Sequence, residues 1–228
     1  MRMKQADFDG PEPGMRTGRI EALSDGVFAI AMTLLVLDLA LPGAGETVGL
    51  REFLGGQVDR FFNYALSFLL LAVFWVRHHQ QFHFIKRTDA GHLWINIFFL
   101  MFVALLPFST SLLGDYPDEA LAEAFFGGNI LMLGLLLTLS WAYATRRYRL
   151  VDRGLDPRHI ALPRERGMLT IIVAASAIAV AFVNPDISSY LYLLILVLQI
   201  ALARRHRRPR GKPDSDSGAI DVPRSGAS

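Results

Sequence analysis

The sequence predicts an all-α, polytopic membrane protein with six transmembrane helices. The first observation is its composition: 52% of the 228 residues are hydrophobic and the mean hydropathy is +0.34, which is more apolar than an ordinary soluble domain. The second is that polar residues collect in short blocks between apolar runs of about 20 residues, the length that crosses a bilayer as a helix. The third is that basic residues fall almost entirely in alternate blocks.

The first predicted helix, residues 19–41, carries charge within and beside its apolar run. These charged residues are Arg19, Glu21, Asp25 and Asp38. A charge in hydrocarbon costs a few kcal/mol on insertion scales, about 2.5 to 3.5, so it usually faces a protein interior or water. This helix is therefore the first candidate for a functional element.

Five further apolar segments follow the first helix. They are residues 58–77, 92–113, 121–145, 167–184 and 187–203. The last two are short, and Asn184-Pro185-Asp186 is the turn between them. We expect a tight helical hairpin of two spans, with an interrupted re-entrant pair as the alternative.

The distribution of positive charge predicts the orientation. Of the 23 Lys and Arg residues, all except Arg51 and Arg60 lie in the blocks on one side of the predicted spans. Cytoplasmic loops of membrane proteins carry such an excess. We therefore expect both termini to be cytoplasmic, in the cell (inner) membrane.

The chain divides into three parts by composition. Residues 1–18 form a polar N-terminal segment that we expect in the cytoplasm, residues 19–203 form one six-helix unit, and residues 204–228 form a basic tail. The tail is rich in Arg, Pro, Gly and Ser and is expected to be disordered. It either binds anionic lipid or serves as a stop-transfer flank.

Polar side chains on three predicted helices lie at one depth near the cytoplasmic side. Asp25 sits about six residues inside the first helix, which is about 9 Å. Trp75 and His78 lie near the cytoplasmic end of the second helix, and Asn96 lies just inside the third. Ser24 and Asp25 are therefore expected to hydrogen-bond these groups as a clamp on the first helix. The alternative is unrelated side chains reaching the membrane interface.

Four histidines gather in the same region, and we weighed them as metal ligands. They are His78, His79, His83 and His92. A membrane di-iron enzyme needs more histidines than the six of this chain, and no carboxylates sit beside these four at helpful spacing. The chain has no cysteine. We expect no metal and no other cofactor.

An apolar stripe runs along the first helix. Ile30, Leu34, Leu37 and Leu41 follow the spacing of one helical face, and Thr33 lies at its edge. At 100° per residue, Asp25 lies about 140° from Ile30. The stripe could face lipid or pack in the core, or it could line the axis of a symmetric oligomer.

The run from Arg19 to Leu35, with Leu23-Ser24-Asp25 at its centre, resembles the RxxxFSD signature of the transmembrane protein 175 family. The runs FWVRHHQQF (residues 74–82) and WINIFFLMFVALLPFSTSLL (residues 94–113) are similar to helices 2 and 3 of that family. Leu23 departs from the signature, because the family usually has Phe there. An apolar contact is kept and an aromatic ring is lost.

The resemblance implies a potassium-permeable channel and not an enzyme. It implies a homotetramer in which the first helix lines the pore, with a constriction at Ile30, Leu34 and Leu37. Thr33 matches a threonine implicated in selectivity. The signature implies a structural clamp made of Arg19, Ser24, Asp25, Trp75, His78 and Asn96. The expected partners are K⁺ ions, membrane lipid and further copies of the chain, with no nucleic acid.

Two other functions stay open from the residues themselves. A secondary transporter would need a midplane site with broken helices, and Pro107 is a candidate break. A membrane enzyme would use the histidines as metal ligands. Whether a channel also passes protons is left open.

Overall fold

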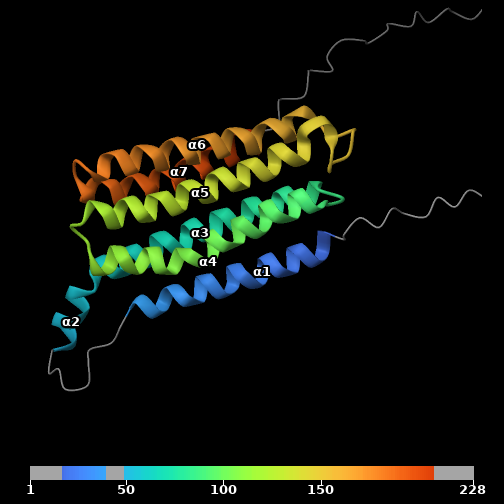
Figure 1. Ribbon diagram of the computed structural model, residues 1–228. Coiled ribbons are helices and arrows are strands. Elements are labelled where there is room, and N and C mark those ends of the chain that lie inside the picture. The colour runs from blue at the N-terminus through green and yellow to red at the C-terminus, as the bar shows by residue number, and fades with distance from the viewer. Residues whose placement is uncertain (1–16, 40–48, 208–228) are drawn as a thin grey trace, which may run out of the picture.

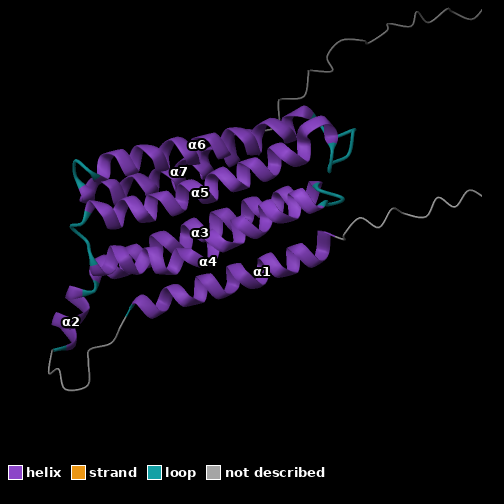
Figure 2. Ribbon diagram, viewed as in Figure 1, coloured by secondary structure: helices purple, strands orange, loops and turns teal. Residues whose placement is uncertain are grey.

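The computed structural model describes residues 17–39 and 49–207. In these residues the regular structure is helical and contains no strand beyond one isolated bridge between Ile85 and Val151 (Figure 2). The elements are α1 (Thr17–Leu34), the 3-10 helix η1 (Leu35–Asp38), α2 (Leu50–Gly56), α3 (Val58–Phe84), α4 (Ala90–Asp115), α5 (Ala120–Thr145), the 3-10 turn η2 (Arg146–Tyr148), α6 (Pro157–Ala181) and α7 (Pro185–Arg207).

The long helices lie side by side, and successive ones run in opposite directions (Figure 1). The start of α1, the end of α7 and the α3–α4 and α5–α6 connections all lie at one end of the bundle. That end carries the basic blocks of the sequence. This arrangement is compatible with the even number of crossings that the charge pattern predicts.

Among the described residues, four helical segments are long and apolar enough to cross a membrane by length and composition. They are Thr17–Asp38, Val58–Phe84, Ala90–Asp115 and Ala120–Tyr148. α6 carries charge in its first turns, and the apolar part of α7, Ile187–Gln199, is short. The protein is thus a helical membrane protein, and the crossing by α6 and α7 stays a prediction.

A turn separates α6 from α7, as expected for a helical hairpin. The side chain of Asn184 accepts a hydrogen bond from the backbone amide of Ile187 at 3.2 Å, so it caps α7. Pro185 follows as the first residue of the helix, where a missing amide hydrogen costs nothing.

Two helices extend well beyond the predicted apolar segments. α6 starts at Pro157 rather than residue 167, because Asp156 caps it by accepting from the amide of Arg158 at 2.8 Å. α3 continues to Phe84 rather than ending at residue 77, because its polar last two turns stay helical outside the apolar run. In both places the helix extends beyond the apolar run.

The first helix also differs from a straight span over 19–41. The α-helical part ends at Leu34, and Leu35–Asp38 form a tighter 3-10 turn. Leu41 lies outside the described residues. The short helix α2 precedes α3 and was not predicted; it has no buried residue.

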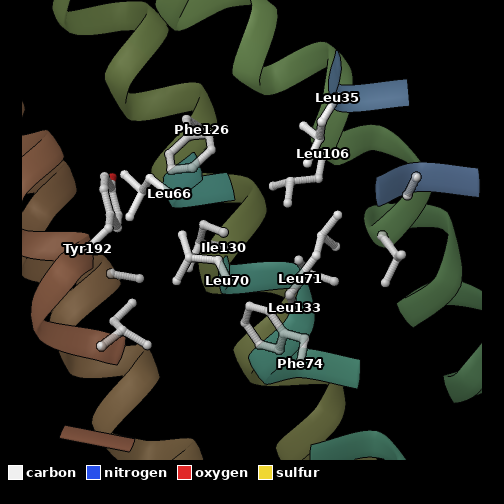
Figure 3. Packing of buried hydrophobic residues seen from close by; sticks show 14 of the residues in the cluster. Leu35, Leu66, Leu70, Leu71, Phe74, Leu106, Phe126, Ile130, Leu133 and Tyr192 are labelled. Atoms are coloured by element: carbon white, nitrogen blue, oxygen red, sulfur yellow. The ribbon is translucent and has the colours of Figure 1, made fainter. Parts of the chain in front are cut away.

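The main core fills the space between α3, α4, α5 and α7 and reaches η1. Figure 3 shows leucines and Phe74 of α3 pointing toward Phe126 and Ile130 of α5, with Tyr192 of α7 beside them. These side chains are at most 2% exposed. The spacing of Leu66, Leu70 and Phe74 is one helical face, and α3 buries this face in the core.

α1 lies at the edge of the bundle. It packs against α4 and α3, while α6 and α7 lie on the opposite side (Figure 1). One face of α1 is therefore covered by the chain and the other is open.

Candidate functional site: the two faces of α1

The packed face of α1 is apolar and interrupted by one hydroxyl. Its buried residues are Ile20, Ser24, Phe28 and Ala31, and Leu35 of η1 continues the same line. The spacing of four, four, three and four residues is a single helical face. This face holds α1 on α3 and α4.

The open face carries the predicted apolar stripe. Ile30 is 61% exposed, Leu34 43% and Leu37 71%, although all three are large aliphatic side chains. Leu23, the departure from the family signature, is also exposed. The stripe has no partner within the described part of this chain, so it is available to lipid or to another copy.

Thr33 lies on the same open face, nine residues after Ser24 and so about 180° around the helix from it. Its hydroxyl donates to the carbonyl of Ile30 at 2.8 Å, which uses its proton. The oxygen keeps its acceptor capacity, and the residue is exposed on the side of α1 away from its packed face. An exposed oxygen acceptor beside an apolar ring can contact water or a cation.

A directed chain of hydrogen bonds ties the packed face to the bundle. His78 Nε2 lies 2.8 Å from Asn96 Oδ1, and Asn96 Nδ2 donates to Ser24 Oγ at 3.4 Å. Ser24 in turn donates to the carbonyl of Ile20 at 2.8 Å. The pattern is self-consistent when His78 carries its proton on Nε2. α1, α3 and α4 are thereby joined at one depth, as the sequence predicted.

Aromatic rings enclose this chain of bonds. His78 stacks on Phe82 at 4.4 Å between ring centroids and lies parallel to Phe99 at 5.5 Å. Phe28 of α1 contacts Phe99 at 5.9 Å. His78, Asn96 and Ser24 are at most 4% exposed. Water is therefore kept from the bonds, and the loss of one partner leaves the others unpaired.

Asp25 lies outside this buried chain. Its carboxylate accepts a hydrogen bond from Trp75 Nε1 at 2.8 Å, and both residues are exposed in the single subunit. Of the groups expected to bond Ser24 and Asp25, Trp75 bonds Asp25 and Asn96 bonds Ser24. One residue turns the helix by about 100°, so the buried position belongs to Ser24 and Asp25 lies at the edge of the packed face.

Arg19 does not join these bonds. It is exposed, and in the described residues it forms no hydrogen bond or ion pair. The structure thus brings together five of the six predicted clamp residues, in two separate groups, and leaves Arg19 apart.

An ionic network at the other end of α1 was missed from the sequence. Arg60 of α3 lies 3.6 Å from Asp38 of η1 and 2.8 Å from Asp115 of α4. The Asp38 side chain is only 5% exposed, and its Oδ2 has no partner among the described residues. The signal was present, because Arg60 is one of two basic residues predicted on that side and its surroundings are acidic.

The histidines are used in bonding and stacking. His92 Nδ1 lies 3.0 Å from Thr88 Oγ1, and its Nε2 lies 3.0 Å from Ser140 Oγ. His79 stacks on Trp75 at 5.8 Å. Within residues 17–39 and 49–207, no group of three or more His, Asp or Glu is arranged to hold a metal ion.

Asp89, in the α3–α4 connection, holds that connection against α5. It accepts from the amide of His92 at 2.9 Å, from the Tyr143 hydroxyl at 3.0 Å and from Arg149 Nε at 2.9 Å. Burial raises the pKa of Asp89, but these three donors outweigh it and the pKa lies below its usual value. The carboxylate is therefore charged at neutral pH and fixes the connection that leads into the Asn96 helix.

The sequence model described as endosomal/lysosomal potassium channel TMEM175 matches residues 19–107, which include every predicted site residue. A protein from Streptomyces collinus named as a potassium channel is 36% identical over 172 residues, 74% of this chain and 84% of the relative. The chain belongs to the TMEM175 family. Its membership, inferred from the helix 1 signature, is confirmed, and the family is one of ion channels and not of enzymes.

A solved structure and a human relative agree with this family. The crystal structure of a lysosomal potassium-selective channel TMEM175 homolog from Chamaesiphon minutus superposes with a TM-score of 0.72 and 31% identity, over 84% of this chain and 98% of that one. The human endosomal/lysosomal proton channel TMEM175 is 30% identical over 149 residues, 60% of this chain and 29% of the human protein. Nearly the whole bacterial channel is therefore matched, but less than a third of the human one.

Proposed function

We propose that the chain is one subunit of a potassium-permeable cation channel in a cell membrane. Each subunit would cross the membrane six times with both termini in the cytoplasm, and four subunits would surround a pore lined by α1. Family membership and the similarity to potassium channels from two bacteria support the permeant ion.

The observation that carries the proposal is the open apolar face of α1. A helix fastened by one face to α3 and α4 leaves the stripe exposed on the other. Apolar exposure costs nothing against lipid, so the stripe is compatible with a lipid face. Thr33 and the family membership favour a pore, because a solvent-facing hydroxyl acceptor is useful on an ion path.

In four copies the stripe would form stacked rings. Ile30 and Leu34 are about 6 Å apart along the helix, and Leu37 lies about 6 Å further in the 3-10 turn. A ring of branched aliphatic side chains excludes water from a narrow passage, and a dry gap stops ions. We propose Ile30, Leu34 and Leu37 as the constriction and Thr33 as a contributor to selectivity.

The residues behind α1 would act as a structural clamp. The buried bonds of Ser24, His78 and Asn96 and the edge bond of Asp25 with Trp75 support this role. For Arg19, the proposal is a contact with a neighbouring subunit, since it is free in the described part of one chain.

The same orientation assigns roles to the ends of the chain. Residues 1–18 would form a cytoplasmic segment, 19–203 the channel unit and 204–228 a basic cytoplasmic tail. The charge asymmetry of the blocks supports this topology. Both terminal segments lie outside the described residues apart from the ends of α1 and α7.

The test is a matched pair of substitutions read by ion flux. Ile30→Asn places an amide in the proposed ring, and Ile172→Asn makes the same change at a 58% exposed site on α6, away from α1. We expect Ile30→Asn to hydrate the constriction and raise K⁺ flux into proteoliposomes several-fold. Ile172→Asn should leave the flux near wild type.

The same two variants, Ile30→Asn and Ile172→Asn, can refute the proposal. If both variants conduct like wild type, or if both change equally, α1 does not line the pore. Thr33→Ala provides a second test. Under bi-ionic conditions its reversal potential should shift toward the Na⁺ equilibrium potential without loss of current. An unchanged reversal potential would remove Thr33 from selectivity.

A further inference from the structure

A buried arginine without a carboxylate partner lies where α3, α6 and α7 meet. Arg77 of α3 is 5% exposed, and its Nη1 donates to Thr170 Oγ1 of α6 at 3.1 Å. Its Nη2 is buried and has no partner among the described residues. A guanidinium keeps its charge at physiological pH, so burial cannot be relieved by loss of the proton.

The groups around Arg77 cannot supply the missing negative charge. The Thr170 hydroxyl is fully used, since it accepts from Arg77 and from Gln199 Nε2 and donates to the carbonyl of Arg166. Arg166 adds a second positive charge that repels Arg77, and its own Nε is buried without a partner in the described chain. The neighbouring carboxylate, Glu165, is exposed and forms no ion pair in the same part of the chain.

Both arginines lie at the depth where the apolar spans begin. Residues 61–76 of α3 are uncharged and Arg77 ends that run, while Arg166 directly precedes the uncharged stretch 167–185 that begins within α6. Gln199 of α7 donates to the carbonyl of Arg166 at 3.1 Å and so stands at the same level. In a membrane this level is the headgroup region of the leaflet at the basic end of the bundle. Arg166 is partly exposed, so the pair borders that region, although its two unpartnered donor atoms are buried in the protein alone.

We propose that Arg77 and Arg166 form a binding site for a phosphate group, supplied by the headgroup of an anionic lipid. Two unpartnered guanidinium donors, Arg77 Nη2 and Arg166 Nε, match the oxygens of a phosphate, and its charge offsets the buried pair. Thr170 joins the two arginine-bearing helices through its bond with Arg77, and Gln199 of α7 bonds Thr170 and the carbonyl of Arg166. The site lies between α3 and α6, away from α1, and does not depend on the proposed pore.

The test measures binding and stability and not current, so its failure leaves the channel proposal untouched. Purified full-length protein is titrated in neutral detergent with short-chain phosphatidylglycerol, short-chain phosphatidylcholine or inorganic phosphate at constant ionic strength, and thermal unfolding is followed. Arg166→Gln removes one donor at a partly exposed position, and Arg164→Gln removes an exposed charge two residues earlier on the same helix as the control.

We expect phosphatidylglycerol to raise the unfolding temperature of wild type and of Arg164→Gln at similar concentrations. Arg166→Gln should need about tenfold more lipid, the effect of losing one charge-assisted hydrogen bond. An equal response to inorganic phosphate supports the site with a soluble anion as its ligand, whereas a response to phosphatidylglycerol without one to inorganic phosphate assigns it to lipid.

Other outcomes overturn the proposal. One is no stabilisation by either phosphate source, and another is equal losses in Arg166→Gln and Arg164→Gln, which would mean that general surface charge attracts the lipid. A third such outcome concerns Arg77→Gln. If this variant is more stable than wild type, and neither wild type nor the variant responds to any phosphate, the buried charge is merely hydrated.

Discussion

Replacing Asn96 by alanine should loosen α1 selectively, because Asn96 joins Ser24 of α1 to His78 of α3 in the buried bond chain. It accepts from His78 at 2.8 Å and donates to Ser24 at 3.4 Å. Within residues 17–39 and 49–207, the long helices that α1 mainly packs against are α3 and α4. The change breaks both bonds at once.

The magnitude follows from the burial of the partners. His78 is 4% exposed, so its freed N–H finds no water, and the Ser24 oxygen, 3.5 Å from Nε2, lies at the limit of hydrogen-bond distance. A buried donor without a partner costs about 1 to 3 kcal/mol, and the 3.4 Å bond to Ser24 adds a fraction of that. A loss of about 2 to 3 kcal/mol in the opening of α1 accelerates exchange of its amides by about 30- to 150-fold.

The assay is hydrogen–deuterium exchange of peptides from residues 17–34, with Asn129→Ala as the control. Asn129 is 3% exposed and bonds Ser109 rather than any residue of α1. Both variants lose a buried amide, so both should unfold at lower temperature. Faster exchange in α1 should appear in Asn96→Ala and not in Asn129→Ala. Equal exchange of α1 in the two variants would refute the idea that this bond chain anchors α1.

Two further predictions concern charged residues outside the buried bond chain. The pKa of Asp89 is lowered, so its contribution to stability is present above its usual pKa of about 4 and is lost as the pH falls through the lowered value. The difference in unfolding temperature between wild type and Asp89→Asn should be constant from pH 7 to 5 and should vanish below pH 4. A difference that persists at low pH would contradict this. Arg60→Gln leaves the buried Asp38 without its cation and should destabilise the protein by about 1 to 3 kcal/mol, while Asp38→Asn added to it should restore part of the loss; strictly additive losses in the double variant would show that the two side chains do not interact.

The sequence predicted the faces of α1 because periodicity and polarity agreed there. Ser24 and the stripe at Ile30 lie on different sides of an ideal helix, and the structure keeps that helix regular as far as Leu34. The depth argument also placed Trp75, His78 and Asn96 beside Ser24 and Asp25, since rise per residue is nearly constant in a helix. The depth argument could not predict which of the two adjacent residues, Ser24 or Asp25, is buried, because that depends on the contact with α3 and α4.

The sequence did not predict features that depend on polar partners far apart in the chain. The start of α6 was missed because its first turns are charged, although Asp156-Pro157 is a recognisable helix start. The burial of Arg77, at the end of the second predicted segment, was missed as well, since a buried arginine looks like an exposed one until Thr170 and Arg166 are placed around it. Composition shows where apolar runs end and not where helices end.

The way α1 is fastened bears on how a constriction at its centre could change. Directional bonds hold it at two places, at Ser24 and at Asp38, about 23 Å apart along the helix. Between them, Phe28, Ala31 and Leu35 hold it through apolar contacts, which tolerate small rotations because they have no required geometry. Ile30 and Leu34 lie opposite that apolar stretch, so the proposed ring can widen by a turn of the helix centre while both anchors stay formed. An anchor beside Ile30 would have prevented such a motion.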